Sequence, residues 1–164
     1  MENIPKYLIV HHTGALKSDP SADTSGQTFE DIDRYHRSLG WESCGYHYVI
    51  EKDGKVVKNP YRDDDYHGAH CKRMNRKSLG ICITGNFNVK LPAKEQVRSL
   101  KKLLREKKGK YDIPLENIVP HRVFASYKSC YGSELSFDWA QKLAKENFLL
   151  VLLRRIKKLF HIDI

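Results

Sequence analysis

Residues 7–13 have the sequence YLIVHHT, and this stretch organises the fold that we expect. Its first four residues form a continuous apolar run, which predicts a buried strand. The run delivers His11, His12 and Thr13 to the carboxyl end of the strand, the edge where open α/β sheets carry their functional sites. We therefore expect a sheet-centred domain whose reactive groups gather around these histidines.

A second stretch, residues 119–130, supplies reactive side chains far along the chain. It contains His121, Lys128 and Cys130. Two imidazoles, His11 and His121, and the Cys130 thiolate make three protein ligands for Zn2+ and leave the fourth tetrahedral position open, as in catalytic zinc sites. The alternative is that both histidines are ordinary strand-end residues and Cys130 a buried thiol, because no closely spaced ligand pair is present.

The composition restricts the class of protein. A chain of 164 residues fits one domain with a substantial core. Its net charge of +9 favours polyanionic partners such as nucleic acid, anionic lipid or an acidic cell-wall polymer. There is no zinc finger, basic-region heptad repeat or aromatic-basic RNA motif, so we expect no specific nucleic-acid partner. The four cysteines lie in unrelated contexts, and we expect them to be reduced.

The rest of the pattern alternates strands and helices. Strands are expected at residues 45–50, 55–57, 78–85 and 118–119, with a hairpin turn at Asp53-Gly54, and helices at residues 28–39, at 93–108 and from 137 onward. This order predicts an α/β fold with a mixed central β-sheet flanked by helices.

The C-terminal segment differs from the rest in composition. Residues 148–153 are all apolar, and four cations follow at positions 154, 155, 157 and 158. A helix of this kind can lie in an anionic membrane interface, whereas the alternative is that it covers the sheet or an oligomer interface. We therefore expect a main domain, residues 1–146, followed by a basic, hydrophobic helical tail, residues 147–164. The apolar run is too short to span a bilayer.

Several short motifs together resemble the type 2 N-acetylmuramoyl-L-alanine amidases, a family that includes phage lysozymes and the peptidoglycan recognition proteins. The motifs follow the family's order between residues 7 and 143: Ile9-Val10-His11-His12-Thr13, Gly40-Trp41, Gly45-Tyr46-His47-Tyr48, Gly68-Ala69-His70, Ser78-Leu79-Gly80-Ile81, His121-Arg122, Lys128-Ser129-Cys130 and Phe137-Asp138-Trp139. The resemblance implies that the main domain has the fold of a zinc amidase or peptidoglycan recognition protein. The reaction implied is hydrolysis of the amide between N-acetylmuramic acid and L-alanine.

The resemblance also implies a role for each matching residue. His11, His121 and Cys130 would be the Zn2+ ligands, while Tyr46 and Lys128 would be catalytic. The zinc would polarise the amide carbonyl and activate water, and the Lys128 ammonium would stabilise the charge that develops on oxygen.

Four further residues, His36, Trp41, His70 and Asn75, fall where the substrate groove of the family lies. One departure concerns the loop that carries the thiol ligand. The family usually has Cys-Pro-Gly, whereas the run here is Cys-Tyr-Gly at residues 130–132. The loop between the second histidine ligand and the cysteine is also one residue longer than in the phage lysozymes, although a loop absorbs one residue at low cost.

These expectations favour a bacteriolytic, antimicrobial phage or prophage endolysin, acting as a monomer on bacterial peptidoglycan. Residues 1–5 show no charged segment leading into an apolar one, so we expect no signal peptide. The enzyme would be made in the host cytoplasm and act on the cell wall, in the periplasm or outside the membrane. Two alternatives stay open: an amidase that recycles muropeptides or serves as an effector, and a non-catalytic peptidoglycan-binding receptor.

Overall fold

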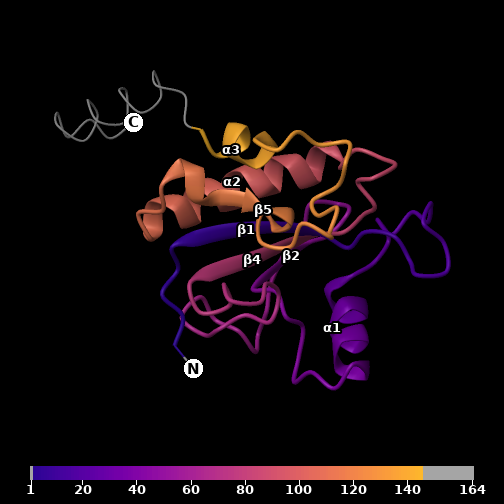
Figure 1. Cartoon of the computed structure of the whole chain (residues 1–164), viewed down its shortest axis with the longest axis horizontal. Coiled ribbons are helices and arrows are strands. Elements are labelled where there is room, and N and C mark those ends of the chain that lie inside the picture. Colours follow the sequence, from indigo (N-terminus) through magenta and orange to yellow (C-terminus); the bar gives the residue numbers. More distant parts are fainter. Residues whose placement is uncertain (1, 146–164) are drawn as a thin grey trace, which may run out of the picture.

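The computed structural model describes residues 2–145, in which strands and helices follow one another in the order expected from the sequence (Figure 1). The strands are β1 (Tyr7–His12), β2 (Tyr48–Ile50), β3 (Val56–Lys58), β4 (Ser78–Ile83) and β5 (Ile118–Pro120). The α-helices are α1 (Phe29–Ser38), α2 (Lys94–Lys110) and α3 (Trp139–Ala144), with short 3-10 helices at Leu115–Asn117 and His121–Val123. The predicted tail, residues 147–164, lies outside the described residues. Within residues 2–145 no helix is long and apolar enough to cross a bilayer.

The five strands form one sheet in the order β3-β2-β4-β1-β5. β1 pairs in parallel with β4 on one side and with β5 on the other. β2 is also parallel to β4, and only β3, the hairpin partner of β2, runs antiparallel within this sheet. The prediction of a mixed sheet flanked by helices is therefore confirmed.

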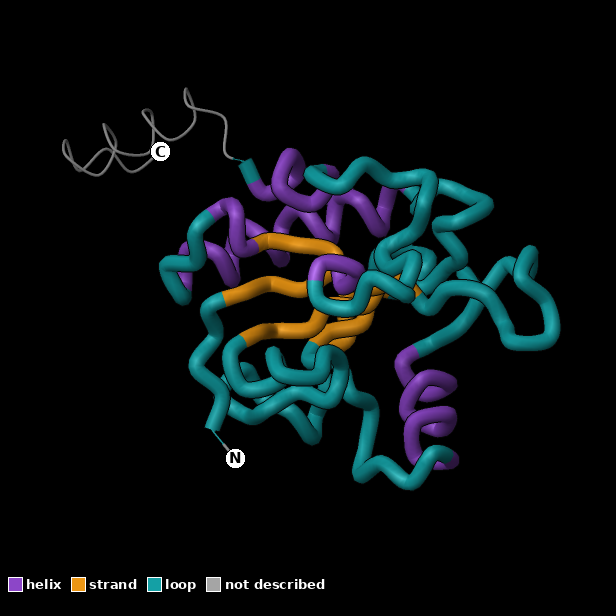
Figure 2. Tube along the Cα trace, viewed as in Figure 1, coloured by secondary structure: helices purple, strands orange, loops and turns teal. Residues whose placement is uncertain are grey.

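Different layers cover the two faces of the sheet (Figures 1 and 2). On one face, Val10 of β1 packs with Leu104 of α2 in the main hydrophobic core, to which α3 also contributes. On the other face, Ile32 of α1 packs with Val49 of β2. Because side chains alternate along a strand, His11 points away from α2, toward the face that carries α1.

One strand is shorter than the sequence predicted. The alternation of residues 45–50 predicted a strand over the whole segment, but β2 begins only at Tyr48. The side-chain amide of Asn59 donates hydrogen bonds to the carbonyls of Cys44 and Tyr46, at 2.8 Å each. At residues 44 and 46 the Asn59 side chain thus bonds carbonyls that a neighbouring strand would otherwise bond, and regular strand pairing of β2 begins at Tyr48.

A buried carboxylate ties the loop after β3 to α2. Asp64 accepts hydrogen bonds from the hydroxyls of Tyr48 and Tyr111, at 2.5 and 2.7 Å, and from the Lys107 ammonium at 3.0 Å. Burial alone would raise the pKa of Asp64, but these hydrogen bonds outweigh it and hold the pKa well below its usual range.

We expect Asp64→Asn to lower the free energy of unfolding by about 3 kcal/mol, because Lys107 would stay buried without its counter-charge. The folded-state pKa of Asp64 lies below the unfolded value of about 3.9. Its contribution is therefore present above about pH 4 and is lost as the pH falls. Urea unfolding at several pH values measures both effects. The control is Asp63→Asn, whose side chain is 68% exposed; equal losses at the two positions would contradict the prediction.

Candidate metal centre

Three side chains converge at the carboxyl ends of β1 and β5. His11 is in β1, His121 directly follows β5, and Cys130 comes from the loop beyond it. Their ligand atoms all lie within 4.8 Å of one another. The structure thus brings together the three residues that were predicted from the sequence to be metal ligands.

The donor set fits a zinc ion. With zinc–ligand bonds of about 2.0–2.3 Å, the ligand atoms of a tetrahedral site lie roughly 3.5 Å apart, so small side-chain adjustments would close this cluster around a metal. Two imidazole nitrogens and one thiolate form a borderline-soft set, which suits Zn2+. Three protein ligands would leave one coordination position for water or substrate.

Burial keeps both candidate imidazoles neutral at physiological pH. It lowers the pKa of His11 well below its ordinary value, with a further contribution from the neighbouring His70. Burial and then the positive charge of Lys128 lower the pKa of His121 to about 4. Neutral imidazoles have a lone pair for a metal, whereas burial raises the pKa of the Cys130 thiol to about 11 and a metal would have to displace its proton.

A chain of hydrogen bonds that runs from His11 to a backbone carbonyl orients the His11 ring. His11 Nε2 lies 3.0 Å from His70 Nδ1, His70 Nε2 lies 3.4 Å from Ser78 Oγ, and that hydroxyl donates to the Met74 carbonyl at 2.7 Å. Because Ser78 donates its proton to Met74, His70 Nε2–H donates to Ser78, and His11 Nε2–H in turn donates to His70 Nδ1. This assignment leaves Nδ1 of His11 for a metal. Gly80 makes room for the chain, since a Cβ there would lie 2.5 Å from the His70 ring.

The tyrosine that replaces the family's proline anchors the loop of Cys130. Tyr131 is fully buried in the core. Its hydroxyl donates to the carbonyl of Phe137 at 2.6 Å and accepts from the amide of Ala140 in α3 at 3.3 Å. Cys130 Sγ accepts a hydrogen bond from the amide of His12 at 3.4 Å. The departure at residue 131 therefore leaves the thiol beside the end of β1.

Sequence reasoning gave Arg122 no role, but the structure uses it to hold the same loop. Its guanidinium donates to the carbonyls of Gly132 and Leu135, at 2.9 and 3.2 Å. The position of Arg122 beside His121 was the available signal. Arg122 directly follows the candidate ligand His121, and its hydrogen bonds reach the chain that follows the candidate ligand Cys130.

Tyr46 and Lys128 both lie near the cluster. The Tyr46 ring is 5.0 Å from that of His11 between centroids, and burial raises the pKa of Tyr46 well above its ordinary value. Lys128 is exposed and lies two residues before Cys130 in the same loop, and its charge lowers the pKa of both His121 and Cys130. The catalytic roles of Tyr46 and Lys128 stay predictions.

The four residues expected in a substrate groove fall into two pairs. His36 and Trp41 stack with ring centroids 4.4 Å apart, and Trp41 is 39% exposed. His36 and His70 are both buried, with 7% and 9% of their surface exposed, and both ring nitrogens of His70 face protein groups. Asn75 uses its Oδ1 to accept hydrogen bonds from the amides of His70 and Cys71. Of these four residues Trp41 therefore offers the exposed side chain, and the assignment of all four to a substrate groove stays a prediction.

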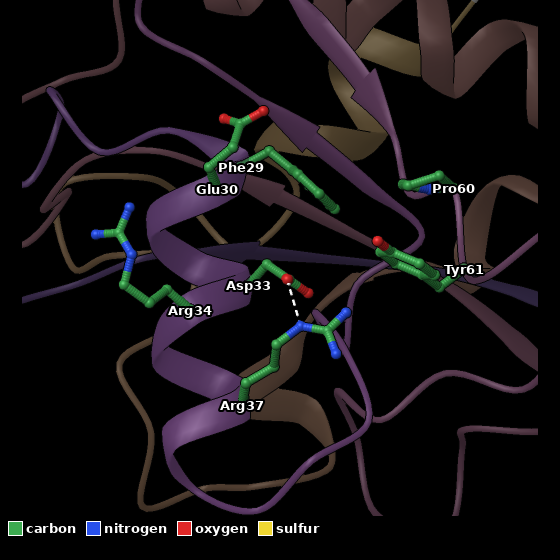
Figure 3. A pocket seen from close by; sticks show the side chains of 7 residues that line it. All are labelled: Phe29, Glu30, Asp33, Arg34, Arg37, Pro60 and Tyr61. Atoms are coloured by element: carbon green, nitrogen blue, oxygen red, sulfur yellow. Dashed lines mark hydrogen bonds and ion pairs between the residues drawn. The ribbon is translucent and has the colours of Figure 1, made fainter.

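A separate hollow of about 500 Å³ lies along another side of α1 (Figure 3). Its lining consists of Phe29, Glu30, Asp33, Arg34, Arg37, Pro60 and Tyr61. The Arg37 guanidinium is held by Asp33 at 2.6 Å and lies 5.0 Å from the centre of the Tyr61 ring. None of these residues belongs to the metal cluster, and the arginine already has its partners within the protein.

Comparison with known proteins gives a consistent result. A family model described as N-acetylmuramoyl-L-alanine amidase matches residues 1–133. Peptidoglycan-recognition protein SC2 of Drosophila melanogaster is 34% identical over 65% of this chain, and the match spans only 56% of the fly protein. The endolysin of Klebsiella phage KP32 is 36% identical over 66% of this chain and 72% of its own. The solved N-acetylmuramoyl-L-alanine amidase LysC from Clostridium intestinale is 25% identical, with a TM-score of 0.69 covering 98% of this chain and 88% of that one.

We expect Cys130→Ser to weaken zinc binding by more than about 100-fold, beyond the range typical of changes outside the ligand set. A hydroxyl replaces the single sulfur ligand, and zinc prefers thiolate. Competition with a chromophoric chelator measures the affinity. Cys71→Ser, which changes a thiol outside the cluster, should retain it; equal affinity of both variants would exclude Cys130 as a ligand.

We expect His70→Ala to lower zinc affinity by about 10- to 100-fold, because the His11 ring would lose the acceptor that fixes its orientation. His67→Gln is the control, since that ring lies outside the chain of hydrogen bonds and bonds only to a neighbouring carbonyl. Unchanged zinc affinity together with weaker binding of peptidoglycan fragments would instead support the original assignment of His70 to the substrate groove.

Proposed function

Because the chain belongs to the N-acetylmuramoyl-L-alanine amidase family, we propose that it hydrolyses the amide between N-acetylmuramic acid and L-alanine in bacterial peptidoglycan. Zn2+ held by His11, His121 and Cys130 is part of this proposal. The observation that carries it is the convergence of these three ligand atoms within 4.8 Å of one another. The activity of the whole protein is a proposal because the chain spans little more than half the length of the first relatives that it matches.

The residues divide the chemistry among them. Zinc, when bound, supplies a Lewis acid that polarises the scissile carbonyl and lowers the pKa of a coordinated water to about 7. The Lys128 ammonium stabilises the negative charge that develops on the carbonyl oxygen, an effect worth about 3 kcal/mol per donor. Tyr46, whose pKa burial raises, keeps its phenolic proton at neutral pH. It therefore acts as a hydrogen-bond donor to the reacting groups or to the departing amine, and not as a base.

The substrate would reach this cluster across the stacked His36–Trp41 pair. His36 accepts a hydrogen bond from the Gly45 amide at 3.1 Å, which fixes its ring. The His36 ring lies 5.6 Å from that of Tyr46. An exposed indole supported in this way offers a flat apolar surface beside the reacting centre, suited to the face of a sugar ring or a peptide stem.

Catalysis is favoured over recognition alone by the thiol. Receptors in this family often lack the cysteine ligand, whereas Cys130 is present here and lies with both histidines. An endolysin role is supported by the similarity to the phage KP32 endolysin. Such an enzyme would be made in the host cytoplasm and would act on the wall beyond the membrane. An amidase for recycling or for use as an effector would prefer soluble muropeptides to intact sacculi, so comparing the two substrates separates these uses.

The test is the release of L-alanine amino termini from purified peptidoglycan by the zinc-loaded protein. We expect Lys128→Ala to lower kcat by about 100-fold or more while leaving zinc content unchanged, since it removes a charge that acts mainly in the transition state. Lys52→Ala, at an exposed position, should retain full activity. Tight wall binding by the zinc-loaded wild type without new termini would make the protein a recognition module.

A further inference from the structure

One side of α2 carries a continuous row of cations. Lys94, Arg98, Lys101, Arg105 and Lys108 follow one another at intervals of three or four residues, and Lys102 stands beside them. At 3.6 residues per turn, the six side chains fall within about 120° of the helix circumference and extend over about 21 Å. We call these six residues the α2 basic row. Lys94, Arg98, Lys101 and Lys102 are exposed, and the other two are half-buried.

The α2 basic row is not neutralised within the described part of the chain. None of the ion pairs among residues 2–145 includes a member of the row. The two acids of α2, Glu95 and Glu106, lie outside the row, and Glu106 pairs with Lys107 at 3.1 Å. The nearby α3 uses Asp138 to bind its own Lys142 at 2.9 Å.

Such a row works against the stability of the helix. Like charges three or four residues apart on a helix repel one another, so the mutual repulsion within the row is unfavourable in the folded chain alone. An external anionic surface would remove the repulsion and gain attraction from every member. The straight, regular spacing suits an extended surface better than a single small anion.

The position of the row leaves the metal cluster accessible. α2 covers the face of the sheet that Val10 faces, whereas His11 points to the opposite face. A surface bound to α2 would therefore not cover the candidate ligands. Figure 1 shows α2 and α3 together on one side of the strands, with α1 on the other.

The chain also leaves α3 beside the row. Arg105 donates a hydrogen bond to the carbonyl of Lys145, the last described residue. The sequence that follows contains the apolar run 148–153 and then four cations within 154–158. The described part of the chain thus ends next to the α2 basic row, and the sequence that continues from it is apolar and basic.

From these observations we propose that the α2 basic row is a docking surface for an anionic phospholipid membrane. A lipid surface matches the row and the composition of the sequence that follows Lys145, because its headgroups attract cations and its interface accepts apolar side chains. A nucleic acid would use the cations but would offer nothing to the apolar run. The proposal concerns a different face from the amidase site and does not depend on catalysis.

Co-sedimentation of the full-length protein with vesicles tests the proposal. We expect binding to vesicles of equal parts phosphatidylcholine and phosphatidylglycerol, decreasing with added salt, and none to phosphatidylcholine alone. The variant Arg98→Gln/Lys101→Gln/Lys102→Gln should bind on the order of 100-fold more weakly, since each cation near an anionic membrane contributes roughly fivefold. Its charge-matched control is Lys6→Gln/Lys17→Gln/Lys77→Gln, at exposed positions outside α2, which should bind nearly as well as the wild type.

Equal weakening of the row variant and the control would show that binding follows net charge alone and would overturn the proposal. Absence of wild-type binding to the anionic vesicles would also overturn it. Retention on duplex DNA that requires the row, without vesicle binding, would assign the surface to nucleic acid instead. Hydrolysis of soluble muropeptides reports on the proposed amidase separately, and the row variant should match the wild type in that assay.

Discussion

The parallel pairing of β1 with β5 is the constraint on which the candidate metal centre depends. Val10 lies opposite Pro120 in this register, so the next residue on each strand, His11 and His121, emerges at the same edge of the sheet. The pairing is held by residues that are buried on both faces. A slip of one residue would turn His11 to the α2 face, because side chains alternate along a strand. The hydrophobic pattern of β1 therefore fixes the position of a metal ligand as firmly as it fixes the core.

Burial of the histidines then sets their chemistry. A buried polar group is costly unless it has a partner, and His11 meets this requirement through His70 and Ser78, which end at a backbone carbonyl. Burial likewise depresses the pKa of His11 and of His121, and so leaves both candidate ligands neutral and able to bind a metal. Burial thus has two effects on these histidines: it requires hydrogen-bond partners for them, and it keeps their rings neutral for a metal. Tyr46 shares that environment with the opposite consequence, since burial keeps its proton in place.

The sequence was sufficient where local pattern decides structure. The apolar run before His11, the helix expected at residues 28–39 and the alternation of strands and helices predicted the architecture, and the order of motifs predicted which side chains meet. It was insufficient where a side chain replaces a backbone partner or where the direction of a side chain decides its role. Asn59, whose amide bonds the carbonyls before β2, is an example of the first case. His70, whose ring faces His11, is an example of the second. Their contacts join segments whose relative placement no local pattern encodes.

The sheet separates two features that would conflict electrostatically, namely a cluster suited to a metal cation and a row of basic side chains. A cluster that binds a cation is weakened by positive charge nearby, and Lys128 is the exposed ammonium whose effect on the cluster is evident. The six cations of the α2 basic row lie behind the opposite face, with the hydrophobic layer of Val10, Leu100 and Leu104 between them and the ligands. Those cations are therefore separated from the metal ligands by the sheet. A chain with a net charge of +9 can carry this concentration of positive charge on one helix because the site that needs neutral donors lies on the other side of the sheet.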